Sequence, residues 1–373
     1  MSERYIGLMS GTSLDGVDGV LADFSDPGFR VVAHSSQIMP VALRAELLAL
    51  NRPGENELHR AALAAQALVR LYHQVVVDLL HRSGIRADEV RAIGAHGQTV
   101  RHRPILDDGI GYTLQLNNPA LLAEWCGIDV IADFRSRDVA AGGQGAPLVP
   151  AFHHSVFRQA RSGTAVLNLG GIANLTVLGP AGQPADSVLG FDCGPANALI
   201  DHWCQQHRGQ NFDRDGAWAA GGQVREDLLA TLLDEPFFAL SPPKSTGRDL
   251  FNADWLDQRL ERHPGIDPQD VQATLTALTV RSCAEAVRRH APSVNRLVVC
   301  GGGAYNATLM AGLARGLPEL QVMDTQALGL SPLQVEAAAF AWLARQTVLG
   351  QPGNLPKATG ARGARVLGAV YPR

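Results

Sequence analysis

The chain has 373 residues, of which 46% are hydrophobic and 18% charged, so it is long enough to bury a large core and is expected to form two domains. The net charge of −4, the pI near 6.3 and the absence of a basic stripe with interleaved aromatic residues argue against a nucleic-acid partner. No apolar run approaches the roughly 20 residues of a membrane span and no apolar signal core follows Met1, which predicts a soluble, cytoplasmic protein without a membrane partner.

The first informative stretch is a predicted hairpin over residues 5–24. Two apolar segments flank a turn rich in glycine, hydroxyl and carboxylate groups, and the returning segment is β-branched and alternating, so it predicts a second strand and not the helix of a P-loop. Such a turn suits phosphate and its magnesium ion. An ordinary surface hairpin, whose turn residues merely supply positive φ, is the alternative.

Helix-like and strand-like segments then alternate, which favours an α/β fold. A helical pattern from Glu57 to Arg82 is closed by Gly84, and a predicted strand over 90–95 leads into His96. A strand over 128–132 leads into the polar run 133–138 and the glycine-rich run 141–147, where we place a domain boundary. Because ligands of open α/β sheets bind beyond the carboxyl ends of strands, these polar loops are candidates for binding.

A second predicted hairpin, residues 165–177, turns at Gly170 and Gly171, which either face phosphate or form a simple bend. The run 190–197 contains the best candidate for a general base, Asp192, at the end of a short strand, with Pro195 placed to open the next helix. The alternative is that Asp192 only caps this helix.

Three further segments carry candidates for binding. The strand over 297–300 ends in Gly301, Gly302 and Gly303, which either admit a flat adenine or ribose against the backbone or form a structural turn. Glu336 lies in an otherwise apolar helix and is either cleft-facing or on a solvated face. The loop 244–249 either binds substrate or is a solvated turn.

Together, these motifs resemble the anhydro-N-acetylmuramic acid kinases, a family of cell-wall amino-sugar recycling within the actin, hexokinase and Hsp70 superfamily. The resemblance spans nearly the whole chain and rests on residues 9–18, 96–99, 142–153, 168–174, 191–197, 245–248 and 301–304. One departure concerns the run Phe-Asp-Thr-Gly-Pro-Gly-Asn usual in the family, where Cys193 and Ala196 replace the threonine and the second glycine.

The resemblance implies a two-lobed ATPase fold, mixed sheets flanked by helices with a central cleft, and a homodimer. The expected first lobe covers residues 1–135 and 343–373, and the second covers 136–342. The resemblance also implies a reaction in which water opens the internal acetal of 1,6-anhydro-N-acetylmuramic acid. In the same reaction O6 takes the γ-phosphoryl group of ATP, giving N-acetylmuramic acid 6-phosphate and ADP. A generic sugar kinase, an Hsp70-like ATP-binding protein and a glycoside hydrolase are the alternatives.

The resemblance assigns the site residues as follows. The general base is Asp192, and magnesium is held through water by Asp15 or Asp18. The amino sugar and its lactyl carboxylate are bound by Arg135, Gly143, Gln144 and Glu336, with Arg135 on the carboxylate because a guanidinium pairs well with it. ATP is bound by Gly11, Thr12, Ser13, Leu14, Asp15, Gly16, Val17, Asp18, Gly170, Gly171, Gly301, Gly302 and Gly303.

Overall fold

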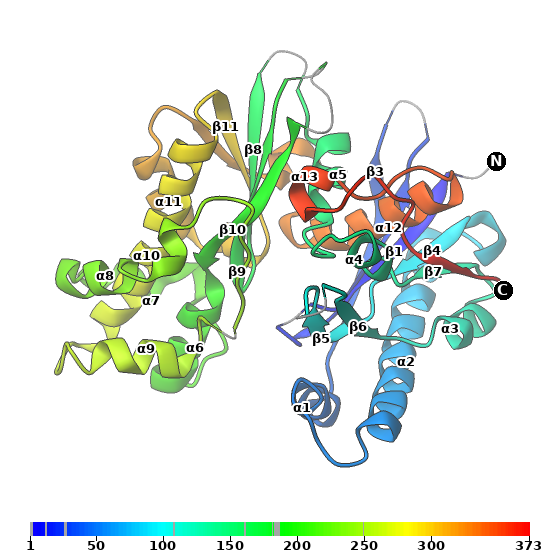
Figure 1. Cartoon of the computed structure of the whole chain (residues 1–373), viewed down its shortest axis with the longest axis horizontal. Coiled ribbons are helices and arrows are strands. Elements are labelled where there is room, and N and C mark those ends of the chain that lie inside the picture. Colours follow the sequence, from blue (N-terminus) through cyan, green and yellow to red (C-terminus); the bar gives the residue numbers. More distant parts are fainter. Residues whose placement is uncertain are drawn as a thin grey trace. The chain divides into compact units, whose positions relative to one another are not determined.

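The computed structural model folds into two compact units, Met1–Phe152 with Gln334–Arg373, and His153–Leu333 (Figure 1). It describes residues 3–11, 13–25, 28–106, 109–159, 162–180, 182, 187–248 and 250–373. Each unit is built on a mixed β-sheet flanked by helices, which confirms the predicted α/β class. The sequence had placed the boundaries at residues 135/136 and 342/343, whereas the first unit extends to Phe152 and resumes at Gln334.

The sheet of the first unit has the strand order β13-β7-β4-β1-β2-β3. Strands β1, β2 and β3 form an antiparallel meander, β1, β4 and β7 run parallel, and β13 is antiparallel to β7. Their bounds are β1 Arg4–Met9, β2 Gly16–Asp23, β3 Arg30–Ile38, β4 Ala92–Ala95, β7 Val130–Ala132 and β13 Ala369–Tyr371.

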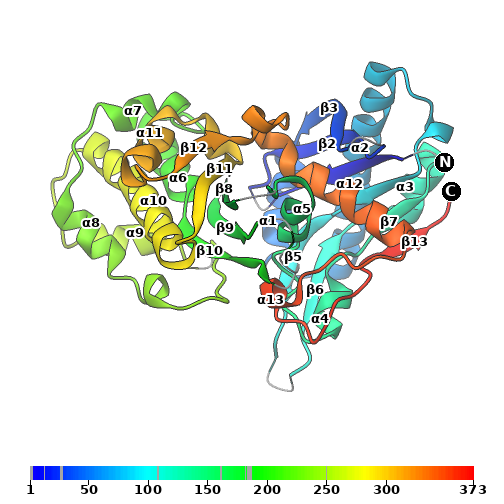
Figure 2. The same ribbon diagram turned by 90° about the horizontal axis from the view of Figure 1, so that it is seen from above.

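Helices cover both faces of this sheet, and a separate hairpin, β5 Gln98–Arg103 with β6 Tyr112–Leu116, follows β4 (Figure 2). The 27-residue α2 packs on β2 and β3, and α12 packs on β1, β2 and β4. The helix bounds are α1 Val41–Ala49, α2 Glu57–Ser83, α3 Pro119–Cys126, α4 Ser136–Ala140, α5 Val149–Val156, α12 Val335–Val348 and α13 Pro356–Thr359; the division between the units falls inside α5.

By length and composition alone, α2 could cross a membrane, and it is the one such helix in the described part of the chain. Half of its most apolar window is buried, and side chains such as Tyr72 and Val75 lie in the core of the first unit. A core helix of this kind passes the same test, so α2 is weak evidence for a span.

The second unit repeats the plan of the first. Its sheet has the order β10-β9-β8-β11-β12, in which β8, β9 and β10 form an antiparallel meander and β8, β11 and β12 run parallel. The bounds are β8 Gly163–Leu169, β9 Ile172–Leu178, β10 Leu189–Pro195, β11 Val294–Cys300, β12 Gln321–Asp324, α6 Asn197–Arg208, α7 Ala217–Ala220, α8 Glu226–Leu233, α9 Ala253–Leu260, α10 Pro268–His290 and α11 Ala307–Gly316.

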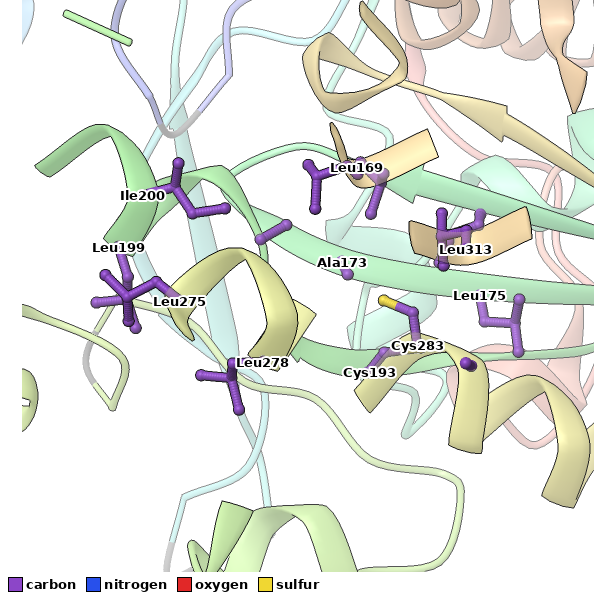
Figure 3. Close-up of a cluster of buried hydrophobic side chains, with 14 of the residues drawn as sticks. Leu169, Ala173, Leu175, Cys193, Leu199, Ile200, Leu275, Leu278, Cys283 and Leu313 are labelled. Atoms are coloured by element: carbon purple, nitrogen blue, oxygen red, sulfur yellow. The ribbon is translucent and has the colours of Figure 1, made fainter. Parts of the chain in front are cut away.

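Helix α10 organises the core of the second unit. Its side chains Leu275, Leu278 and Cys283 lie among residues of the sheet and of the helices α6 and α11, as Figure 3 shows. Because 12 of the 23 residues of α10 are buried, the helix contacts both the strands and the outer helices. Strand β10, which carries Asp192 at its middle, is therefore backed by a packed core.

Two glycines bring α12 directly onto the sheet of the first unit. Gly7 of β1 pairs with Gly94 of β4, and a Cβ on either residue would collide with the backbone of α12, at Ala337 and Phe340 respectively. The buried face of α12 is itself rich in alanine, so backbones approach where larger side chains would hold them apart. This contact explains why residues 334–342 belong to the first unit.

We therefore predict that Gly94→Ala lowers the free energy of unfolding by about 3 kcal/mol, because the added methyl group has only rigid backbone to displace. Urea unfolding measures the effect. The matched control is Gly363→Ala, where the nearest atom is the flexible tip of Arg365 and the expected change is within about 0.5 kcal/mol. Equal stability of the two variants would contradict the contact.

Candidate active site

In the first unit, the predicted site residues gather where the parallel strands end. The turn after β1 begins at Ser10, β4 is followed directly by His96, and β7 is followed by residues 133–135. Because these three strands are parallel neighbours, their carboxyl ends share one edge of the sheet. The Ser10 hydroxyl donates to Gln98 Oε1 over 2.5 Å and so links the turn after β1 to β5.

The turn between β1 and β2 is a real hairpin turn. Leu14 has φ 57°, its N–H donates to the Gly11 carbonyl over 3.2 Å, and its buried side chain anchors the turn in the core. Val17 is buried in the same core, so only the backbone of Leu14 and Val17 remains available to a nucleotide. Thr12 lies outside the described residues.

The two aspartates proposed for magnesium differ in their surroundings. Asp15 is exposed, and its carbonyl accepts the N–H of Met39. Asp18 lies on β2 with 45% of its side chain exposed and its Oδ1 3.5 Å from His34 Nε2. Among the described residues, no group of three or more His, Cys, Asp and Glu side chains is arranged to hold a metal ion. Within the described residues, neither carboxylate therefore belongs to a direct protein cage for a metal ion.

The glycines predicted to contact nucleotide fall into two classes. A Cβ on Gly11, Gly170, Gly171 or Gly302 would come no closer than ordinary van der Waals contact, and none of the four has a left-handed φ. In contrast, a Cβ on Gly16 would collide with the backbone of Gln37. A Cβ on Gly301 would collide with Asn168 and Leu169, and one on Gly303 would collide with Leu169. The fold thus explains the second class, whereas the first class leaves space that a ligand approaching the backbone would use.

Arg135 is held from two sides. Its Nε–H donates to His96 Nε2 over 3.0 Å and its Nη1–H donates to the Gly145 carbonyl over 2.8 Å. Burial lowers the pKa of Arg135 to about 10, against the opposing charges of Glu336 and Asp138. The guanidinium is therefore charged at neutral pH and fixed in orientation.

The loop that contains Gly143 and Gln144 is anchored by a fully buried carboxylate, Asp138. Its Oδ2 accepts the N–H of Gly145 over 2.8 Å, and its Oδ1 accepts from Asn354 Nδ2 at 2.6 Å and from Thr359 Oγ1 at 2.7 Å. The Gln144 N–H donates to the Thr359 carbonyl. A Cβ on Gly143 would collide with Asp138, so this glycine is required by the packing itself.

Glu336 lies in the first turn of α12 and is partly buried. Burial raises the pKa of its carboxyl group, the Arg135 charge opposes this shift, and the Asp18 charge adds to it. Glu336, Arg135 and Asp18 are thus close enough to interact electrostatically, which argues against the fully solvated alternative for Glu336.

In the second unit, the turn at Gly170 and Gly171 is bonded to the start of α6. The N–H groups of Ala196 and Ala198 donate to the Gly171 carbonyl, and that of Asn197 donates to the Gly170 carbonyl, over 3.0–3.1 Å. Asn197 Nδ2 also donates to the Leu169 carbonyl over 2.8 Å. The helix thereby satisfies its first N–H groups on the carbonyls of the turn.

Asp192 lies on β10 beside a bulge in its pairing with β9. Its N–H donates to the Lys244 carbonyl over 3.1 Å, and its Oδ2 accepts the N–H of Thr246 over 2.9 Å. The N-cap residue of α6 is Ala196, with no side-chain cap bond, and Pro195 ends β10 instead of opening the helix. Asp192 is therefore held by the loop 244–246 and does not cap α6.

The surroundings of Asp192 tune its protonation. Burial raises its pKa to about 6, against the Thr246 N–H and the Lys244 charge. The Lys244 ammonium group donates to the Phe237 and Phe238 carbonyls and lies 4.5 Å from the centre of the Phe237 ring. The Thr246 hydroxyl oxygen is buried without a partner among the described residues, so it is available to a bound water.

The two departures from the usual motif point into the core and not toward the carboxylate. Cys193 is buried against Cys283 of α10, and burial with this neighbour raises the pKa of its thiol well above the usual value (Figure 3). Ala196 is 1% exposed. Both replacements therefore alter packing behind Asp192 and leave its hydrogen bonds to the loop 244–246 in place.

At the end of β11, Gly301 has φ 79° and its N–H donates to the Pro332 carbonyl. Gly302 and Gly303 do not open a long helix directly, because a 3₁₀ turn, Gly302–Tyr305, comes before α11. Asn306 caps α11 by accepting the N–H of Leu309. Of the three glycines, only Gly302 lies where a side chain would have room.

Comparison with known proteins decides the family. The model of the family "Anhydro-N-acetylmuramic acid kinase" matches residues 3–373. The chain belongs to the anhydro-N-acetylmuramic acid kinase family. It is 63% identical to the anhydro-N-acetylmuramic acid kinase of Albidiferax ferrireducens over 100% of both chains, and 62% identical to that of Variovorax paradoxus over 99% of both.

The likeness to a solved structure concerns the fold. Component A of the Acidaminococcus fermentans (R)-2-hydroxyglutaryl-CoA dehydratase has a TM-score of 0.50 and 10% identity, with 91% of this chain and 96% of that chain covered. With the family membership, it confirms the predicted actin/hexokinase-like ATPase fold.

Several residues that shape this kinase site were not predicted as part of it. The sequence places His96 within a motif without a role of its own, and it gives no role to Asp138, Asn354 or Thr359. The signal for Asp138 was a carboxylate four residues before a glycine pair, but two of its partners, Asn354 and Thr359, lie more than 200 residues away in the chain. Pairings of this kind come from the tertiary fold, which a motif does not contain.

The raised pKa of Asp192 predicts a pH-dependent stability. A folded pKa of about 6 against a usual 3.8 means that Asp192 contributes stability below pH 3.8, which is lost as the pH rises through 6. Asp192→Asn should therefore be more stable than the wild type by about 1–2 kcal/mol at pH 7.5, with no advantage near pH 4. Urea unfolding at both pH values measures this. Asp257→Asn, on the exposed side of α9, should follow the wild type throughout, and an equal advantage at both pH values would contradict the assignment.

Proposed function

We propose that this chain is an ATP-dependent kinase that opens 1,6-anhydro-N-acetylmuramic acid and phosphorylates its O6, giving N-acetylmuramic acid 6-phosphate and ADP, in cell-wall recycling. The observation that carries the proposal is the half-buried Asp192. Its carboxylate accepts a hydrogen bond from the Thr246 N–H, and its pKa is raised to about 6. A carboxylate with this pKa is ionised at neutral pH and is a better proton acceptor than an ordinary aspartate.

In the proposed reaction, Asp192 takes a proton from a water molecule whose oxygen bonds to C1 of the sugar. The C1–O6 bond breaks, O6 bonds to the γ-phosphorus of ATP, and the bond from that phosphorus to the bridging oxygen of ADP breaks. Because O6 leaves carbon as it joins phosphorus, no second acid is required to protonate it. Thr246, whose N–H donates to the Asp192 carboxylate, also has a buried hydroxyl oxygen without a partner among the described residues, which supports a water site in this loop.

The nucleotide is assigned to the glycine turns. Gly11, Gly170, Gly171 and Gly302 have the open backbone that a phosphate chain or ribose requires. A magnesium ion, held through its water shell by Asp15 and Asp18, would neutralise phosphate charge. For the sugar we propose Arg135 on the lactyl carboxylate, with Glu336 and the loop of Gly143 and Gln144 on the ring.

We propose that the protein works as a cytoplasmic homodimer with a small amino sugar as its substrate, and that it has neither a nucleic-acid nor a membrane partner. The net charge of −4 supports the exclusion of nucleic acid.

The deciding experiment follows ADP formation and the fate of ¹⁸O-water. We expect ADP only when the anhydro sugar is present, and ¹⁸O at C1 of the product. Asp192→Asn should lower kcat by at least about 10³-fold and leave ATP binding within a factor of about two, since the base acts on water and not on nucleotide. The control is Asp257→Asn, with wild-type turnover.

Each competing function predicts a different result. Unlabelled product would indicate a generic sugar kinase that uses a substrate hydroxyl. Sugar-independent ADP formation that Asp192→Asn leaves unchanged would indicate an Hsp70-like protein, and ring opening without ATP would indicate a hydrolase.

A glycine series tests the nucleotide assignment separately. Gly302→Ala should weaken ATP binding about 10-fold while the thermal unfolding midpoint of the free protein stays within about 1 °C, because only a ligand needs the space. Gly303→Ala, a matched neighbour, should instead lower the unfolding midpoint by several degrees, since its Cβ would lie 2.5 Å from Leu169 Cβ. Unchanged ATP affinity in Gly302→Ala would contradict the assignment.

A further inference from the structure

The contact between His96 and Arg135 has one possible direction of donation. Arginine has only donors, so His96 Nε2 must accept the Nε–H across the 3.0 Å that separates them. Burial and the neighbouring Arg135 charge hold the pKa of His96 well below its usual value, which keeps the ring neutral and able to accept. The imidazole proton is then on Nδ1.

His96 is itself held rigidly. Its N–H donates to the Leu8 carbonyl over 3.1 Å, and its ring packs on Phe340 of α12 with 4.7 Å between ring centres. Phe340 lies four residues after Glu336, so one face of α12 carries both the support for His96 and the carboxylate beside Arg135. The side chain of His96 is 4% exposed.

These hydrogen bonds determine which N–H donors of the Arg135 guanidinium remain free to bind a ligand. Of its five N–H donors, the bonds to His96 and Gly145 use two and leave three. The pair of donors formed by Nε–H and one N–H of Nη2 is not free as a pair, because His96 accepts the Nε–H. Two of the three remaining donors are on Nη2, which makes no hydrogen bond within the described part of the chain, and the third is on Nη1.

We propose that His96 is a positioning residue, which aims Arg135 end-on at a carboxylate of the sugar and so gives this kinase its preference for substrates that carry one. The inference rests on the proposed function, in which Arg135 binds the lactyl carboxylate. A bidentate grip requires the guanidinium plane to coincide with the carboxylate plane, and the hydrogen bond to Nε fixes that plane.

The test compares two sugars: 1,6-anhydro-N-acetylmuramic acid, and 1,6-anhydro-N-acetylglucosamine, which has the same bicyclic ring without the lactyl group. His96→Leu should raise KM for the lactyl sugar about 10-fold, with kcat within about threefold and KM for the other sugar unchanged. His96→Gln, whose amide oxygen can accept the same N–H, should restore most of the loss. The matched control is His73→Leu, a part-buried ring on α2 that should leave both KM values unchanged.

A coupling measurement separates this inference from the proposal on which it rests. In an Arg135→Met background, His96→Leu should add no further increase in KM, because its effect passes through the guanidinium. An equal rise of KM for both sugars in His96→Leu, or full additivity with Arg135→Met, would overturn the positioning role while the carboxylate assignment of Arg135 stands. If Arg135→Met itself does not distinguish the two sugars, the assignment and this inference both fail, whereas ¹⁸O incorporation at C1 still reports the kinase reaction.

Discussion

The close approach of α12 to the sheet is the constraint on which the candidate site of the first unit depends. Gly7 and Gly94 lie side by side on β1 and β4, and the lack of a Cβ on both lets the backbone of the helix lie directly on the strands. That contact fixes the position of the first turn of α12, and it therefore also fixes the position of Glu336. It also presses Phe340 against His96 and Phe134, so the residues after β4 and β7 pack on the same helix. A segment near the end of the chain thus sets the geometry at the ends of strands formed by the first 132 residues.

The buried carboxylate of Asp138 performs the same task for the glycine-rich loop. It accepts hydrogen bonds from the Gly145 backbone and from two side chains of the C-terminal segment, Asn354 and Thr359, so loop and segment share one acceptor. A buried polar group is tolerated only when it is well hydrogen-bonded, and three donors bond to this carboxyl group. The Gly145 carbonyl is then fixed where Arg135 donates to it. Arg135 is thus oriented by His96, which directly follows β4, and by a loop that Asp138 anchors.

Local patterns predicted much of this molecule and failed where contacts are long-range. Alternation and turn residues placed the hairpin around Gly11, and helical periodicity placed α2 over 57–82, against the observed Glu57–Ser83. The motif around Asp192 predicted a carboxylate on a strand before a helix, and β10 and α6 have that order. Its partners were not predictable, because the N–H that holds it comes from Thr246, 54 residues later. For the same reason the unit boundaries were misplaced: hydropathy shows that α12 is buried, but not against which sheet.

The two sheets have the same strand plan although their strand ends differ in sequence. The orders β3-β2-β1-β4-β7 and β10-β9-β8-β11-β12 are the same plan, a meander followed by two parallel strands, so the plan can be compared strand by strand. The turn after the first strand carries a glycine with open space in both units, Gly11 in one and Gly170 in the other. The strand that follows the meander ends differently, in the buried His96 in one unit and in the left-handed Gly301 in the other. The shared backbone plan therefore does not determine the residue at the end of each strand. The plan needs only apolar strands and short turns, whereas the packing around a strand end selects the residue there, as the close approach of Asn168 and Leu169 does for Gly301.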